Sequence, residues 1–204
     1  TLIDLETNKE VVHSYSDRKN GAFLVTLPVD RNYALIVNKD KYNPYSVNFN
    51  LTVPENSTDP YHMDVPLIPI YSDAPVTLEN VFFDLDSYVL RKESYIELDK
   101  FVDFLNKNAE IKLELQGHTD TQGDDDRNMT LSDNRAKSVM KYLINKGINA
   151  DRLTAKGYGE TKPNTIEVNG QNVELTEEYI NSLPANERRA AHQLNRRTMY
   201  EIKR

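Results

Sequence analysis

The chain has 204 residues, a formal net charge of −7 and a pI of about 5.2, which argues against a broad electrostatic attraction to nucleic acid or anionic lipid. It contains no cysteine, so disulfides and thiolate metal sites are excluded. No apolar run approaches the roughly 18 residues that a membrane-spanning helix needs, and no signal peptide is visible. Because the sequence starts at Thr1 inside an alternating pattern, we interpret it as a piece of a longer protein, in which missing targeting signals carry no weight.

Short alternating apolar runs separated by turn residues predict an all-β unit over residues 1–70. The predicted strands lie at Val11–Val12, Phe23–Leu27, Tyr33–Val37, Val47–Leu51 and Val65–Ile70. Residues 71–75 carry turn-forming residues and no periodicity, so they predict a linker between two domains.

Residues 76–204 alternate between strand and helix patterns. We predict a strand at Val81–Phe83, an amphipathic helix at Ser94–Leu105, a strand at Ile111–Leu115, a second helix that Lys146-Gly147 ends, and strands at Leu153–Lys156 and Thr198–Ile202. Thr130 and Asp133 have the spacing of a capping pair for the second helix. This order predicts a two-layer α/β unit.

An insertion at about residues 164–192 interrupts that order. Asn169-Gly170 predicts the turn of a β-hairpin, and Leu175–Leu183 predicts a short helix that Pro184 ends. The segment is either a decoration or a contact surface.

Two opposite charges bracket the transition from the strand at Ile111–Leu115 to the second helix. Asp120 follows the strand, and Arg135 lies on the helix. Such a pair has two uses. The two charges can form a structural salt bridge, or they can hold a ligand that carries both an ammonium and a carboxylate.

The sequence motifs around this pair resemble those of OmpA-like peptidoglycan-binding domains. The signature N-x-x-L-S-x-x-R-A-x-x-V-x-x-x-L is complete here, at Asn128, Leu131, Ser132, Arg135, Ala136, Val139 and Leu143. Its flanking marks are Phe83-Asp84-Leu85-Asp86, Gly117-His118-Thr119-Asp120, Gly157-Tyr158-Gly159-Glu160 and Asn195-Arg196-Arg197. The resemblance implies a β-α-β-α-β-β domain at residues 76–204. Residues 1–70 resemble a carboxypeptidase-regulatory-like β-sandwich that lacks its first strand, so the expected fold class is α+β.

The resemblance also implies a ligand, the diaminopimelate residue of a peptidoglycan stem peptide. Asp120 would accept from its ammonium, and Arg135 would bind its carboxylate in a bidentate manner. Backbone N–H groups of Asp86 and Ser87 would complete the carboxylate cradle. The walls of the site would be Thr119, Thr121, Asn128 and Leu131. Ser87 stands where relatives often carry Lys, and Leu85 where they often carry Phe.

Other readings of these residues are weaker. His118 and Asp120 suggest a metal, but no second histidine lies near them in the sequence, so a satisfied histidine is the preferred interpretation. The run Asp120–Asp126 fails the calcium-loop pattern at Gln122 and Asp125 and is expected to be a solvated loop. For Arg196 and Arg197 we favour a structural role. We predict no catalytic residue, metal site or cofactor.

The expected function is a non-enzymatic cell-wall anchor. The chain would bind peptidoglycan in the periplasm and hold the outer membrane or an envelope complex in place, associated with the outer membrane through a part outside this sequence. The sequence of the segment His192–Thr198 resembles that found in Bacteroidetes-type envelope proteins, some of which serve a secretion or gliding machine. The alternatives are a protein–protein interaction module with a vestigial cleft, which would use the β-sandwich or the insertion, and a wall hydrolase, which would release soluble muropeptides.

Overall fold

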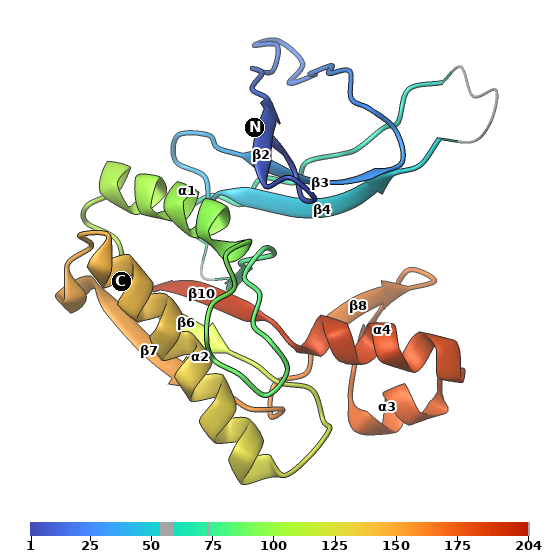
Figure 1. The fold of residues 1–204 in the computed structure, drawn as a ribbon, viewed down its shortest axis with the longest axis vertical. Helices are drawn as coiled ribbons and strands as arrows, with labels where there is room; N and C mark the ends of the chain where they lie inside the picture. Colours follow the sequence, from blue (N-terminus) through green and yellow to red (C-terminus); the bar gives the residue numbers. More distant parts are fainter. Residues whose placement is uncertain (54–58, 73, 204) are drawn as a thin grey trace. The chain divides into compact units, whose positions relative to one another are not determined.

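The computed structural model describes residues 1–53, 59–72 and 74–203 (Figure 1). The chain forms two compact units, Thr1–Ser72 and Asp73–Arg204. Within the described residues, no helix has the length and apolar character needed to cross a membrane. Residues 54–58 of the predicted first domain, residue 73 of the predicted linker and residue 204 lie outside the described residues.

The first unit contains one antiparallel sheet. Its strands are β1 (Leu2–Asp4), β2 (Lys9–Val12), β3 (Arg31–Val37) and β4 (Tyr45–Leu51), in the order β2-β1-β3-β4. Leu2, Tyr33, Leu35 and Leu51 form its buried core. Loop residues cover this core from the side, among them Val25, Leu27, Met63 and Val65.

Two predicted strands of this unit are wrong. Residues 23–27 and 65–70 run as irregular chain, apart from one bridge between Tyr42 and Pro69. Val25, Leu27 and Val65 of these segments do pack on the core, but packing against a sheet does not require hydrogen bonds within it. The strands predicted at Val11–Val12, Tyr33–Val37 and Val47–Leu51 are confirmed. The sandwich architecture stays a prediction, since the described part of the unit has a single sheet.

The second unit is a four-stranded sheet with two long helices. Its strands are β5 (Val76–Thr77), β6 (Lys112–Gly117), β7 (Leu153–Gly157) and β10 (Thr198–Lys203), in the order β5-β10-β6-β7. Strands β6 and β7 are parallel, and β10 is antiparallel to both of its neighbours. The helices are α1 (Ser94–Lys107) and α2 (Asp125–Asn145), and a short 3₁₀ turn, η1 (Ala150–Arg152), precedes β7. The mixed α+β class is confirmed.

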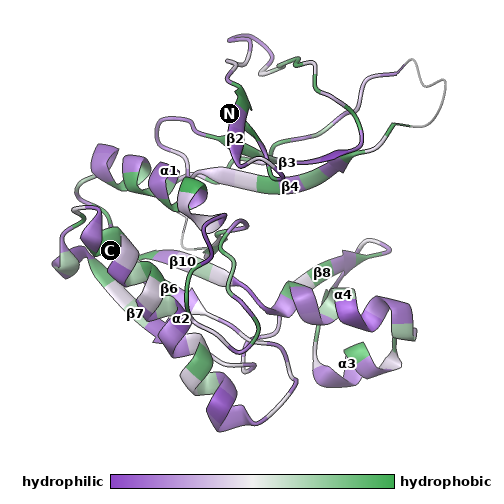
Figure 2. Ribbon diagram, in the orientation of Figure 1, coloured by the Kyte–Doolittle hydropathy of each residue, from purple (hydrophilic) through white to green (hydrophobic). Residues whose placement is uncertain are grey.

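Both helices form because their apolar residues recur at helical spacing. The predicted stripe of α1, Leu98, Phe101, Val102 and Leu105, is buried throughout, and the Phe101 ring contacts the Tyr200 ring of β10 at 4.6 Å between centroids. Helix α2 packs on β6 and β7 and ends before Gly147, whose φ is +97°, as predicted. Figure 2 shows hydrophilic and hydrophobic residues on both helices, the pattern of elements with one buried face.

Two expectations about this unit are corrected. The first strand is β5, whereas Val81–Phe83 makes only one bridge, from Phe83 to Leu90. Helix α2 begins earlier than a Thr130–Asp133 capping pair would allow. Its N-cap is Asp124, whose side chain accepts the N–H of Arg127 at 3.0 Å. Asp125 and Asp126 occupy the first turn, where negative charge is favourable, so the acidic run starts a helix.

The helix α2 approaches the sheet closely at two neighbouring glycines. Gly117 ends β6, Gly157 ends β7, and the two are partners in the parallel register. A Cβ at Gly117 would overlap the carbonyl oxygen of Ser132, and one at Gly157 would lie 2.5 Å from the Ser132 hydroxyl oxygen. Two of the sequence marks, those that begin at Gly117 and Gly157, therefore have a packing explanation.

The insertion between β7 and β10 has its own small core. It contains the hairpin β8 (Thr165–Val168) and β9 (Gln171–Glu174), then α3 (Glu177–Ser182) and α4 (Ala185–Asn195). The hairpin turn at Asn169-Gly170 and the short helix before Pro184 are confirmed. Helix α4 is not predicted, and Pro184 is its N-cap. Leu175, Ile180 and Ala191 form the core.

Candidate functional site

The predicted site residues come from two loops and the helix α2, and a third loop, which holds none of them, lies beside these residues. His118, Thr119 and Asp120 follow β6, and Asp84–Ser87 precede α1. The third loop is the junction between α4 and β10. Thr198 pairs with Gly117, and the N–H of His118 donates to the Arg197 carbonyl at 3.0 Å. This register brings the end of the insertion beside the residues that follow β6.

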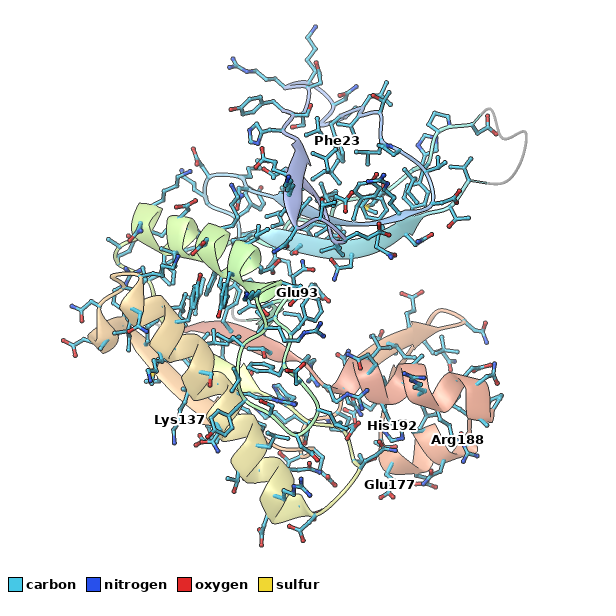
Figure 3. All side chains as sticks on the ribbon, in the orientation of Figure 1. Phe23, Glu93, Lys137, Glu177, Arg188 and His192 are labelled. Carbon is cyan, nitrogen blue, oxygen red and sulfur yellow. The ribbon has the colours of Figure 1, made fainter. Side chains whose placement is uncertain are left out.

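Asp120 is buried and already has a partner. Its Oδ2 atom forms an ion pair with Nη1 of Arg196, and Nδ1 of His192 lies 3.9 Å from the same oxygen. Its Oδ1 atom accepts the N–H of Gln122 at 3.1 Å. Only 7% of the Asp120 side chain is exposed. Figure 3 shows His192 on α4, the insertion helix that leads into β10.

Arg135 is also buried, and it is oriented by backbone. Its Nε donates to the Ser87 carbonyl at 2.9 Å and its Nη2 to the Asp84 carbonyl at 3.4 Å. The guanidinium lies over the Phe83 ring, 5.1 Å from its centroid. Burial lowers the pKa of Arg135, with a further contribution from Arg196. No ion pair joins Arg135 to Asp120 within 4.0 Å among the residues the structure describes, so the salt bridge considered between these two charges is not formed.

The loop Asp84–Ser87 differs from the expected carboxylate cradle. The N–H of Ser87 donates to the Asp84 carbonyl at 3.1 Å, so it closes the loop on itself. Ser87 serves Arg135 through its carbonyl instead. Asp86 adopts a φ of +52°, and its carboxylate forms an exposed salt bridge with Arg127 at 2.9 Å. Ser87 stands where relatives often carry Lys. Because it contacts Arg135 through its backbone carbonyl, a group that any residue supplies, this difference leaves the contact in place.

Of the expected wall residues, Asn128 has a clear structural role. Its side-chain amide donates to the carbonyls of Asp120 and Gln122 at 3.3 and 3.2 Å, and to Oε2 of Glu160 at 2.9 Å. Thr119 is buried, and its N–H donates to the Gly159 carbonyl at 2.9 Å. These bonds hold the loop that carries Asp120 against the loop that follows β7.

Thr121 and Leu131 are half-buried. Leu131 borders an open groove of about 370 Å³ between the Asp86–Tyr88 loop and the first half of α2. The residues that line it with Leu131 are Asp86, Tyr88, Asp126, Arg127, Thr130 and Asn134. The structure thus brings Asp86 and Leu131 to this groove, and Asp120 and Arg135 are not among its lining residues.

His118 is buried, and neither of its ring nitrogens has a hydrogen-bond partner within the described residues, which does not fit the satisfied histidine expected from the sequence. Its ring stacks on Tyr158, with 5.4 Å between centroids and 9° between planes. Burial, together with the charges of Arg197 and Lys162, lowers its pKa to about 3, so the ring is neutral at physiological pH. Across the described ranges, no group of three or more His, Cys, Asp or Glu side chains is placed to hold a metal ion.

The two arginines before β10 have different roles. Arg197 donates to the carbonyls of Asn195 and Lys162 at 3.2 and 3.1 Å, which fits the structural role expected for it. Arg196 does not fit, because it binds the central carboxylate of the site. No local sequence pattern indicated this contact, which depends on the register between β10 and β6. A closing strand that pairs Thr198 with the end of β6 places Arg196 opposite the residues after Gly117.

Comparison with known proteins finds a family match within the second unit. Residues 82–176 match the model of the OmpA family, so the chain contains an OmpA-family domain at these residues. The matched segment includes β6, α2, β7 and the hairpin of the insertion, and it ends before α3, α4 and β10.

Curated relatives support the same assignment over part of their length. The outer membrane porin F of Pseudomonas fluorescens is 38% identical over 84 residues, which are 41% of this chain and 26% of the porin. The peptidoglycan-associated lipoprotein of Pasteurella multocida is 36% identical over 83 residues, which are 41% of this chain and 55% of the lipoprotein. The chain therefore spans only part of the length of these two relatives.

Among solved structures, the crystal structure of the peptidoglycan-associated lipoprotein from Burkholderia pseudomallei is similar to this chain with a TM-score of 0.47 and 23% identity. The similarity covers 60% of this chain and 88% of the lipoprotein chain.

Proposed function

We propose that the second unit binds peptidoglycan non-covalently, through the diaminopimelate residue of its stem peptide. The observation that carries the proposal is a pair of buried opposite charges, Asp120 and Arg135, that lie on different elements and do not neutralise each other. A ligand that presents an ammonium and a carboxylate would give Arg135 an anionic partner and would replace Arg196 as the cationic partner of Asp120. The OmpA-family match and the name of the Pasteurella multocida relative, a peptidoglycan-associated lipoprotein, support an association with peptidoglycan.

The chemistry of each residue follows from its donors and acceptors. A guanidinium has five N–H donors, and Arg135 uses Nε and one N–H of Nη2 on backbone carbonyls. The others remain for a carboxylate, which they would bind in a planar, charge-assisted manner. Asp120 can only accept when it is ionised, so it would take the ammonium. Asn128 would keep Asp120 in place, while Thr119, Thr121 and Leu131 would border the ligand.

Binding of this kind serves an anchor rather than a reaction. One amino acid of the wall offers few contacts, so the holding strength would come from many copies that bind a repeating polymer. We infer a periplasmic location, in which the domain fixes the outer membrane or an envelope complex to the wall, without catalysis. The first unit and the insertion are the surfaces that would contact other envelope proteins.

One observation favours the alternative, an interaction module with a vestigial cleft. The ion pair with Arg196 already satisfies Asp120. In that case the wall ligand would find no free carboxylate, and the first unit or the insertion would carry the function.

Calorimetric titration with a diaminopimelate-containing stem peptide tests the proposal. We expect saturable binding by the wild type and at least a tenfold loss of affinity in both Asp120→Asn and Arg135→Lys. Asparagine keeps the shape of Asp120 but not its charge, and lysine keeps the charge of Arg135 but not its planar donors. Lys137→Gln is the matched control, because Lys137 is an exposed cation on the same helix (Figure 3), and we expect its affinity to stay within twofold of the wild type.

The same proteins, incubated with purified sacculi, separate the functional classes. Retention on the sacculi that is lost in both site variants supports the anchor. A folded wild type that binds neither the stem peptide nor sacculi rejects it in favour of the interaction module. Release of soluble muropeptides would instead indicate a hydrolase, and we expect none.

A further inference from the structure

The insertion helix α4 reaches the candidate site, although it lies beyond the segment that matches the OmpA family. It contributes His192, and Arg196 is its C-cap. Both side chains approach the same oxygen of Asp120. The inference that follows concerns what these contacts do to a ligand, and it rests on the function proposed above.

The contacts of Arg196 indicate that it blocks access of a ligand to the Asp120 carboxylate. The Asp120 side chain is 7% exposed and that of Arg196, its ion-pair partner, is 30% exposed, so the guanidinium takes up an oxygen of a carboxylate that has little exposed surface left. The Nη2 atom of Arg196 also donates to Oε1 of Gln193 at 2.6 Å, a second contact within the same turn of chain. An ammonium that is to bind Asp120 must therefore take the position that the guanidinium holds.

The charges of the site lead to the same conclusion. Asp120, Arg135 and Arg196 together carry one net positive charge, and Arg196 lies close enough to Arg135 to disfavour its charged form. A ligand ammonium added while Arg196 stays in place would meet an excess of positive charge. If Arg196 leaves as the ammonium arrives, Asp120 keeps one cationic partner throughout, and no buried charge is left unpaired.

We propose that Arg196 occupies Asp120 in the ligand-free protein and is exchanged for the ammonium of the ligand. The competent state is the one in which Arg196 has left Asp120. The apparent dissociation constant of the ligand is the intrinsic one divided by the fraction of molecules in that state. Removing the guanidinium raises this fraction, so it tightens binding, whereas removing a residue that binds the ligand weakens it.

Titration of the full chain with the diaminopimelate-containing stem peptide tests this exchange. We expect Arg196→Gln to bind about three- to tenfold more tightly than the wild type, as follows when the competent fraction rises from about a tenth or a third to near one. Arg189→Gln is the matched control, since it removes the same charge from an exposed position of the same helix. Its affinity should equal that of the wild type.

Each result of the titration either supports or overturns the exchange. Tighter binding by Arg196→Gln alone, beside a wild type that binds, supports the exchange. Equal or weaker binding by Arg196→Gln, beside a wild type that binds, overturns the exchange and leaves the proposed function intact. If circular dichroism shows both proteins folded and neither binds, the proposed function fails and the exchange fails with it.

A measurement on the wild type alone covers the case in which Arg196→Gln does not fold. The assigned ¹⁵N side-chain resonances of Arg196 should change when the stem peptide is added, because the guanidinium moves from a buried carboxylate to solvent. Resonances of Arg196 that stay unchanged at saturation, while those of Arg135 shift, overturn the exchange.

Discussion

The variant Gly117→Ala should unfold with a free energy about 3 kcal/mol lower than that of the wild type. The new methyl group would overlap the carbonyl oxygen of Ser132 and lie 2.8 Å from its carbonyl carbon. Both atoms belong to the backbone of α2, which cannot move aside as a side chain does. Overpacking a well-packed region costs about 1–3 kcal/mol, and contact with helix backbone places this variant at the upper end. Urea unfolding, followed through the resonances of residues 74–203, measures the loss.

The control for this prediction is Gly147→Ala. Gly147 has a φ of +97°, and a Cβ there would meet no atom within 4 Å. The substitution therefore adds backbone strain, worth about 1–2 kcal/mol, without a collision. If the two variants lose the same stability, α2 shifts away from β6 at little cost and the close approach is not what requires glycine at position 117.

The second large effect is a loss of stability in acid caused by His118. Its pKa falls to about 3 in the folded protein from an ordinary value of 6.5, chiefly through burial. The unfolded chain binds the proton more readily than the folded protein. The contribution of the neutral ring to the free energy of unfolding is therefore complete above pH 6.5 and decreases as the pH falls toward 3. Linkage gives about 1.4 kcal/mol per pH unit in that window, hence about 2.5 kcal/mol between pH 7 and pH 4.5.

Substitution by a residue that does not ionise isolates this contribution. In His118→Gln, the difference in unfolding free energy between pH 7 and pH 4.5 should be about 2.5 kcal/mol smaller than in the wild type. The carboxylates that titrate in the same range are common to both proteins and cancel in the comparison. Urea unfolding at the two pH values provides the data. Equal pH dependence of the two proteins would show that the ring takes up its proton without leaving its buried position.

The sequence was a good guide wherever a pattern was local. The stripe from Leu98 to Leu105 defines α1 because helical spacing alone decides which residues face the sheet. The Asn169-Gly170 turn was equally local, because both residues adopt the positive φ that a tight hairpin requires. The alternation at Phe23–Leu27 failed because alternation describes two faces of a chain but supplies no neighbouring strand. Val25 and Leu27 pack on the core and Leu24, on the other face, is 79% exposed, so the alternation is present without a neighbouring strand.

The site shows the same division. The motif around Arg135 identified the helix and the loops that surround it, and these do lie together. The partner of Asp120 was out of reach, because Arg196 is 76 positions away in the sequence. Their contact depends on the pairing of β10 with β6 and on the helix α4. The apolar pattern of the sequence did not predict α4, because this helix is mostly polar (Figure 2). The assignment of the eight predicted site residues to a ligand stays a prediction that the titrations test.

The strand order of the second unit also determines the order in which its strands can pair during synthesis. The segment from β6 to β7, with α2 between them, is a contiguous parallel unit that can form as it leaves the ribosome. The other edge of β6 waits for β10, whose first residue lies about 80 positions after Gly117. At roughly 5–20 residues per second, that edge stays without its partner for about 4–16 s. A premature stop codon before residue 198 would therefore release a chain in which both β5 and β6 lack their shared neighbour, a substrate for proteases and for aggregation.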